Sequence, residues 1–142
     1  VASSPQDLLE QCDLIVTTTT AREPILMQGK KRKKPQHITC IGADAPGKME
    51  LDPAIVAESD LLVCDSKSQT QERGEFQECL RQNTEQIKDI VELGELIQNR
   101  PDLHRESDPT NDDRWTIFDS SGVAVQDCAV ATLVSKLLQE DE

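Results

Sequence analysis

The clearest chemical signal in this sequence is a lone carboxylate, Asp44, placed where an apolar run ends. The stretch HITCIGADAPGKMELDP, residues 37–53, reaches Asp44 after a Gly-Ala pair and then turns at Pro-Gly before Lys48. Apolar neighbours would partly desolvate this carboxylate and raise its pKa towards values useful for acid–base catalysis. Lys48, four residues on, could instead hold Asp44 ionised or bind an anionic group. Asp is also common in turns, so a purely structural turn residue is the alternative.

Hydroxyl groups follow two other apolar runs. The first run ends in a row of threonines, of which the first two need no function because β-branched residues favour strands. Thr19 and Thr20 lie beyond the apolar core and could offer hydroxyls to a sugar or a phosphate. Residues 120–122, Ser-Ser-Gly, precede a long helical pattern, so their backbone N–H groups would lie at its positive end. An ordinary N-cap serine is an equally simple interpretation.

Four short apolar runs end in these polar residues and favour β-strands. The runs span residues 12–21, 37–44, 59–66 and 114–122. They lack strict alternation and are rich in Ile, Val, Leu and Cys, which is typical of strands covered on both faces.

Helical patterns alternate with these runs. Residues 6–11 fit the end of a helix, Asp52 and Pro53 predict an N-cap and first turn, and a weak amphipathic helix is expected within 67–82. Further helical stripes span 87–97 and 123–139. The last is apolar around much of its circumference, which predicts burial against a sheet or a partner subunit.

Strands that alternate with helices predict an α/β fold with right-handed crossovers and a mainly parallel sheet. In open sheets of this kind, ligands bind outside the carboxyl ends of the strands. The rule places four groups of strand-end residues on one rim. They are residues 17–20, 42–44, 65–66 and 120–121.

Composition narrows the class of protein. The 142 residues suffice for one domain, and a net charge of −12 disfavours binding to nucleic acid or an anionic membrane. The basic run 30–34 is the exception, and it fits either a solvated loop or a nucleic-acid or nuclear-import patch. Five cysteines without a C-x-x-C pair indicate reduced thiols and neither a metal site nor a disulfide framework. No signal peptide or 18-residue apolar run is present, so a soluble, cytoplasmic protein is expected.

One expected part of a nucleotide-binding sheet is missing. Neither a G-x-G-x-x-G turn nor a Walker loop occurs, and the sequence opens with a helix already under way. We therefore expect residues 1–142 to be the later part of a larger protein.

Five ordered segments resemble the ornithine cyclodeaminase/mu-crystallin family. They read DLIVTTTTAREPIL, HITCIGADAPGKMELDP, SDLLVCDS, IVELGELI and TIFDSSGVAVQDCAVATLV, and they cover about residues 6–138. The resemblance implies that residues 1–142 are the C-terminal portion of a partial Rossmann-type, doubly wound NAD(P)-binding domain, with 123–142 as a long terminal helix. A separate substrate-binding and dimerisation domain, built largely from the N-terminal part, would lie outside this chain.

The resemblance also implies an activity. In cyclodeaminase members, tightly bound NAD⁺ takes a hydride from the amino acid Cα, the side-chain amine attacks the imine, ammonia leaves, and the hydride returns. The leading expectation is ornithine converted to proline and ammonia by a homodimer that uses NAD, with NADP possible. Alternatives within the family are an alanine or other amino-acid dehydrogenase, a cyclic imine reductase, and a non-catalytic mu-crystallin-like binding protein. This chain alone is expected to be inactive.

The resemblance assigns roles to individual residues. Asp44 matches the aspartate thought to handle proton transfer, and Ser121 falls beside the substrate pocket. The expected contacts to the dinucleotide are Thr20, Ile38, Thr39, Cys40, Ile41, Lys48 and Ser120. All of these roles require the loop tips that follow the strands, at residues 17–20, 42–48 and 119–122, to converge on one nicotinamide pocket.

Overall fold

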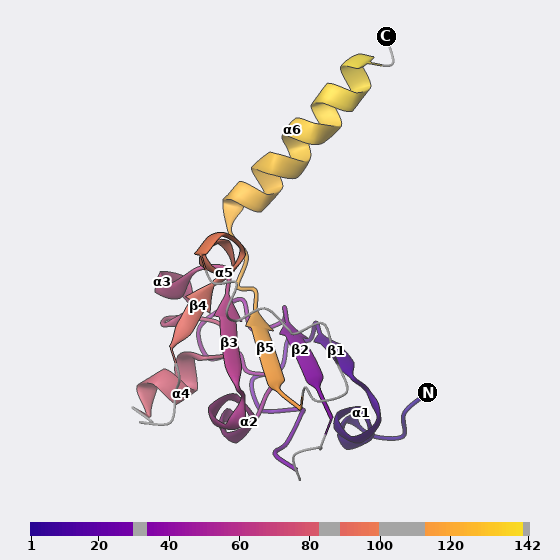
Figure 1. Cartoon of the computed structure of the whole chain (residues 1–142), viewed down its shortest axis with the longest axis vertical. Coiled ribbons are helices and arrows are strands. Elements are labelled where there is room, and N and C mark those ends of the chain that lie inside the picture. The colour runs from indigo at the N-terminus through magenta and orange to yellow at the C-terminus, as the bar shows by residue number, and fades with distance from the viewer. Residues whose placement is uncertain (30–33, 83–88, 100–112, 141–142) are drawn as a thin grey trace.

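A five-stranded parallel sheet organises the chain. The computed structural model describes residues 1–29, 34–82, 89–99 and 113–140. The strands are β1 (Leu14–Thr17), β2 (Gln36–Cys40), β3 (Leu61–Cys64), β4 (Ile90–Glu92) and β5 (Trp115–Asp119). Their order across the sheet is β1-β2-β5-β3-β4, and every pairing is parallel (Figure 1). The predicted α/β class with a mainly parallel sheet is confirmed. All four predicted strands are present, as β1, β2, β3 and β5.

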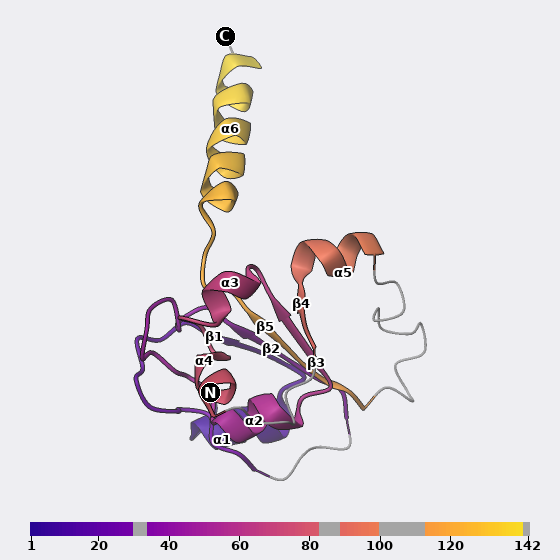
Figure 2. The same cartoon turned by 90° about the vertical axis from the view of Figure 1, so that its left-hand side faces the viewer.

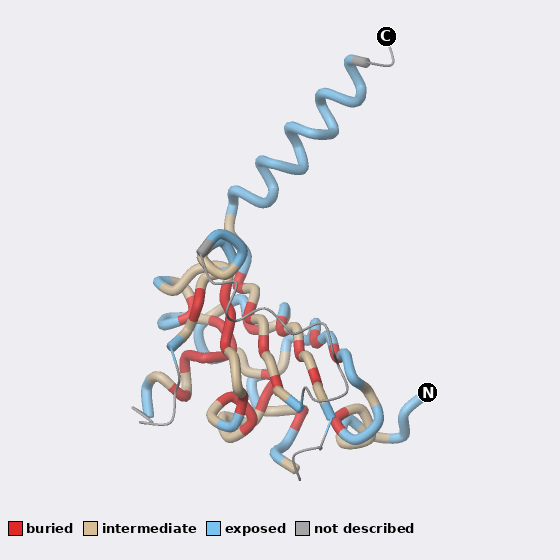
Figure 3. Tube along the Cα trace, in the orientation of Figure 1, coloured by how far each residue is buried: buried red, intermediate tan, exposed pale blue. Residues whose placement is uncertain are grey.

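Three helices cover one face of this sheet. They are α1 (Pro5–Gln11), α2 (Pro53–Glu58) and α4 (Gln77–Arg81). Asp52 accepts a hydrogen bond from the Ala54 N–H at the start of α2, as predicted. The expectation that the sequence opens with a helix already under way is wrong, because Ser4 caps α1 in a reciprocal capping box. The apolar side chains of these three helices form one core with inward-facing strand residues. Figure 2 shows the helices on this face of the sheet, and Figure 3 marks the buried positions along the chain in red. The core includes Leu9, Ile15, Ile38, Ile55, Leu62, Cys79 and Ile117.

Burial alternates along three of the strands, which corrects the expectation that they are covered on both faces. In β1, Ile15 and Thr17 are buried, whereas Leu14 and Val16 are exposed on the other face. The same two-residue period appears in β2 and β5, where alternate residues are only half-buried. Each strand therefore has one face in the core, as its pleat requires.

Two helical predictions were wrong in detail. Ile90 and Val91, read as part of a helical stripe over 87–97, form the edge strand β4, and α5 covers only Leu93–Asn99. The helix expected within 67–82 is divided into α3 (Lys67–Thr70) and α4. Gly74 lies between them with φ +98°, a left-handed conformation that interrupts the helix and suits only glycine.

The last helix, α6 (Ala124–Glu140), projects away from the sheet (Figures 1 and 3). Residues 124–139 are exposed, including Val130, Leu133 and Leu137. The predicted helix is confirmed, but its expected burial against this sheet is wrong. Burial against a partner subunit stays a prediction.

All five cysteines are free thiols, and Cys40 and Cys64 are buried in the core. None of the helices in the described segments combines the length and apolar character needed to cross a lipid bilayer. Most of the basic run 30–34 lies outside the described residues, as does 100–112.

Candidate functional site

The polar tips of neighbouring strands meet at one edge of the sheet. The Ile41 N–H donates to the Thr17 carbonyl at 2.9 Å, which joins the ends of β1 and β2. The Ser120 N–H donates to the Cys40 carbonyl at 2.9 Å, which joins β2 to β5. Since all strands run parallel, this edge carries their carboxyl ends, where open α/β sheets bind ligands.

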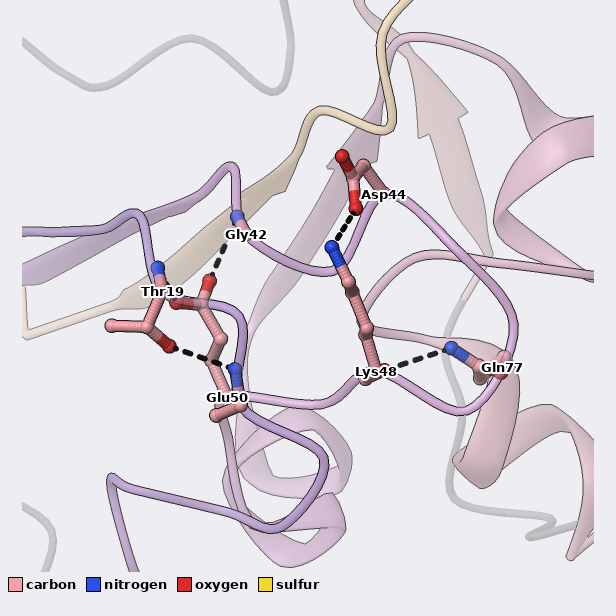
Figure 4. A network of polar contacts seen from close by, with 7 residues as sticks. Thr19, Gly42, Asp44, Lys48, Glu50 and Gln77 are labelled. Atoms are coloured by element: carbon pink, nitrogen blue, oxygen red, sulfur yellow. Dashed lines mark hydrogen bonds and ion pairs between the residues drawn. The ribbon is translucent and has the colours of Figure 1, made fainter.

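Asp44 lies at this edge but is not desolvated. Its side chain is 58% exposed and pairs with the Lys48 Nζ at 2.5 Å (Figure 4). The hydrogen bond and charge of Lys48 hold the pKa of Asp44 below its usual value of 3.8. The expectation of a raised pKa is therefore wrong for this structure, because the ammonium outweighs the small loss of hydration. In the free protein Lys48 holds Asp44 ionised, which is the first of the two roles considered for it. Its expected contact with the dinucleotide stays a prediction.

Residues 45–48, which follow Asp44 and end at Lys48, form a type II turn. The Lys48 N–H donates to the Ala45 carbonyl at 3.2 Å, and Gly47 has φ +74°, as the third position of such a turn requires. The turn backbone is contacted by Gln77, whose Oε1 accepts from the Gly47 N–H and whose Nε2 donates to the Lys48 carbonyl, both at 3.0 Å.

A buried carboxylate, Glu50, ties the first two tips together. Its Oε2 accepts hydrogen bonds from the Thr17 hydroxyl at 2.6 Å and the Gly42 N–H at 2.9 Å. Its Oε1 accepts from the Thr19 N–H at 2.6 Å. Glycine is required at 42, since a Cβ there would lie 2.1 Å from the Thr19 carbonyl oxygen. Figure 4 shows Glu50 pointing at both loops.

Two further carboxyl groups lie beneath the edge. Glu75 accepts hydrogen bonds from the backbone N–H groups of Glu50 and Leu51, and burial raises its pKa from 4.5 to about 8. Asp119 accepts from the Thr70 hydroxyl, and burial raises its pKa from 3.8 to about 6. A nearby Asp119 charge also raises the pKa of Glu75. Burial thus disfavours the ionised form of both carboxyl groups, Glu75 and Asp119.

The two serines at the end of β5 are held by Asp65. Ser120 donates to Asp65 Oδ2 at 3.3 Å, and Ser121 donates to Asp65 Oδ1 at 3.2 Å. The Gly122 N–H also donates to Asp65, at 2.8 Å. The alternative of a serine N-cap is wrong, because α6 begins only at Ala124 and the two hydroxyls donate elsewhere. Ser120 donates to Asp65, just after β3, and Ser121 also donates to Gln69 Oε1 of α3, at 2.9 Å. Ser121, the predicted substrate contact, is 6% exposed.

The other predicted cofactor contacts occupy different environments. Ile38 and Cys40 have buried side chains in the core, so any contact with a ligand would involve their backbone. Thr39 lies on the opposite face, where its hydroxyl contacts His37 at 3.1 Å. Ile41 and Thr20 are exposed at the tips. Their roles as cofactor contacts stay predictions.

The pKa of Glu75 leads to a testable pH dependence. Because the folded-state pKa is raised to about 8, the stabilising preference for the neutral acid is complete below about pH 4.5 and is lost as the pH rises to 8. A Glu75→Gln variant stays neutral and keeps an oxygen for both N–H groups. Wild type should therefore lose unfolding free energy relative to this variant by up to about 1.4 kcal/mol per pH unit in that window.

Urea unfolding of the intact protein at about pH 5, 6.5 and 8 measures this difference. Exposed Glu72→Gln is the matched control and should follow wild type at each pH. Parallel pH dependences for wild type and Glu75→Gln would show that Glu75 titrates normally.

Sequence reasoning missed Glu50, Glu75 and Gln77 as parts of this edge. It placed Asp65 on the rim but did not predict its contacts with the two serines. Glu50 lies 31 residues from Thr19, and Gln77 lies 30 residues from Gly47. No local spacing predicts such contacts. The crowded Gly42 was the one available signal, because a glycine at a strand end marks a close backbone approach.

Similarity to known proteins covers the entire chain. The sequence profile of the ornithine cyclodeaminase/mu-crystallin family matches residues 1–142. Alanine dehydrogenase from Archaeoglobus fulgidus is 37% identical over 131 residues, which are 92% of this chain and 38% of that protein.

Two solved structures share the fold. The iminosuccinate reductase of Paracoccus denitrificans in complex with NAD⁺ superposes with a TM-score of 0.82 at 34% identity, covering 99% of this chain and 41% of that one. The Δ¹-pyrroline-2-carboxylate reductase of Thermococcus litoralis, in complex with NADH and L-proline, gives 0.80 at 27% identity, covering 99% and 42%. This chain spans about two fifths of the length of each relative.

Proposed function

Because this chain belongs to the ornithine cyclodeaminase/mu-crystallin family, we propose that it forms the nicotinamide side of an NAD-dependent enzyme. The reaction class is hydride transfer at the Cα of a small amino acid or of the corresponding imine. The observation that carries the proposal is the Asp44–Lys48 pair, whose carboxylate is exposed beside the joined ends of β1, β2 and β5. The relatives support it, since two of the three are described with NAD⁺ or NADH bound.

The residues at the edge fit one half of the dinucleotide. Thr20 offers an exposed hydroxyl suited to a ribose, and Ile41, 42% exposed, offers an apolar surface suited to a nicotinamide ring. When bound, NAD⁺ supplies the hydride acceptor. These 142 residues contain no Gly-rich turn of the kind that holds a pyrophosphate, so the residues proposed here account for the nicotinamide half alone.

Asp44 is the proton-transfer group in this proposal. Its ionised carboxylate can accept a proton from the substrate amino group, which leaves the nitrogen lone pair free to form the C=N bond as hydride departs. A substrate that covers Asp44 removes water from it and raises its pKa towards the range in which a carboxylate is an effective base. Lys48 keeps the free site in the base form.

Two reactions of this class are candidates for the activity. Oxidation of an amino acid gives the 2-oxo acid, ammonium, one NADH and one proton for each NAD⁺ and water consumed, and imine reduction is the related reverse chemistry. Cyclodeamination of ornithine gives proline and ammonia without net NADH. The relatives with 37% and 34% identity are a dehydrogenase and a reductase, which supports the first candidate. A relative with 36% identity is described as an uncharacterized cyclodeaminase, which supports the second. A homodimer stays a proposal for the intact protein.

Product analysis with Cα-deuterated substrates tests the proposal. Alanine should transfer its Cα deuterium to NAD⁺ and give deuterated NADH in stoichiometric amounts if the protein is a dehydrogenase. Ornithine should give proline that retains deuterium at Cα, with no NADH accumulation, if it is a cyclodeaminase. Retained dinucleotide binding without any deuterium transfer, including in the reductive direction with cyclic imines, would refute the enzyme proposal and identify a binding protein.

A further inference from the structure

The side-chain amide of Gln77 is buried and satisfied by three contacts. Gln77 is the first residue of α4 and is 4% exposed. Its Oε1 accepts from the Gly47 N–H, and its Nε2 donates to the carbonyls of Lys48 and Gly74 at 3.0 and 2.8 Å. Figure 4 shows this amide against the backbone of the turn, opposite the side on which Lys48 reaches Asp44. Two of its three hydrogen bonds therefore hold the turn rather than its own helix.

The turn needs such an anchor because its charged pair cannot supply one. Asp44 is mostly exposed, and ion pairs at exposed positions contribute little to holding a conformation. The Lys48 side chain starts from the same peptide unit whose carbonyl Gln77 binds. Fixing that unit fixes the direction in which Lys48 leaves the backbone.

The helix itself does not account for this arrangement. The N-cap of α4 is Phe76, and no side chain caps that end. The segment just before it also contacts the continuation of the turn, since Glu75 accepts from the backbone N–H groups of Glu50 and Leu51. Side chains of residues 74–77 thus form hydrogen bonds with backbone groups at both ends of the segment 47–51.

We propose that Gln77 is a positioning residue that sets the geometry of the Asp44–Lys48 pair at the reacting end of the site. It acts through the turn backbone and contacts neither substrate nor cofactor. The inference rests on the proposed function, because the consequence for catalysis requires Asp44 to handle protons. The structural part, anchoring of residues 45–48, does not depend on it.

The test is Gln77→Met in the intact protein, which keeps the length of the side chain and removes all three hydrogen bonds. Gln82→Met is the matched control, an exposed glutamine at the other end of α4. We expect kcat to fall about 10-fold or more while the KM for NAD changes less than about 2-fold, because misplacement affects the chemical step. Amide hydrogen exchange at Gly47 should accelerate about 10-fold or more, while the control resembles wild type in every measurement.

A second variant covers the case in which Gln77→Met does not fold. The carboxyl group of Gln77→Glu can accept from the Gly47 N–H, and only in its protonated form can its single O–H donate to the Lys48 carbonyl, the second contact with the turn. Burial of this position favours the protonated form. The kcat of this variant relative to wild type should recover as the pH is lowered. A ratio that is independent of pH would contradict the proposal.

The remaining outcomes separate the two claims. If Asp44→Asn disables the enzyme but Gln77→Met leaves kcat unchanged, the positioning role is wrong even if exchange at Gly47 is faster. If wild type transfers no hydride at all, the proposed function fails. Exchange at Gly47 then decides alone whether Gln77 anchors the turn, and unchanged exchange would overturn that part as well.

Discussion

Replacing Asp44 by asparagine in the intact protein should lower kcat about 100-fold or more, with little change in NAD affinity. The amide keeps the size of the side chain and can still accept a hydrogen bond from Lys48. It cannot accept a proton, and a positioned acid–base group contributes about 10²–10⁴-fold to rate. Since Asp44 is exposed and carries no buried contact in the free structure, folding should be unaffected. Steady-state kinetics with the deuterated substrates, together with NAD titration, measures both quantities.

Glu10→Gln is the matched control for this experiment, because Glu10 is exposed on α1 and takes no part in the site. It should retain wild-type kcat. Turnover of Asp44→Asn at the wild-type rate would remove Asp44 from the mechanism and leave the family assignment intact.

The sequence predicted the parallel sheet well because each strand is a local apolar run. The end of each run also located the rim, since parallel strands bring their carboxyl ends to one edge. Strand β4 was missed because Ile90 and Val91 also fit a helical spacing, and three residues are too few for a period to decide. Likewise, nothing local indicated that Gly74 would adopt φ +98° and divide the helix predicted within 67–82.

The site was harder to predict than the sheet because its geometry comes from long-range contacts. Asp44 was correctly placed at the rim, but its pKa depends on which neighbour its carboxylate contacts. Lys48 was one option and desolvation the other, and only the turn at Gly47 decides between them. The apolar pattern of α6 correctly predicted a helix. It could not predict which surface would cover that helix, since burial depends on the rest of the assembly.

Glu50 carries the largest expected effect on stability. Three donors converge on its two oxygens, and the side chain is 0% exposed. Glutamine has the same shape but replaces one acceptor oxygen by an NH₂ group, which would face a hydroxyl or backbone donor. Leaving buried donors unpaired costs about 1–3 kcal/mol each. We therefore expect Glu50→Gln to lower the free energy of unfolding by about 2–4 kcal/mol despite its conservative size.

Urea unfolding of the intact protein measures this loss, with exposed Glu72→Gln as the matched control expected within about 0.5 kcal/mol of wild type. Amide exchange gives the local consequence. The Thr19 and Gly42 N–H groups are bound by different oxygens of Glu50, so in Glu50→Gln one of the two loses its acceptor and should exchange faster. The Gly47 N–H, held by Gln77, should not exchange faster than the global loss of stability requires. A variant as stable as wild type would mean that the tips of β1 and β2 hold together through their backbone contact alone. Glu50 would then not be the residue that fixes the edge on which the proposed nicotinamide site depends.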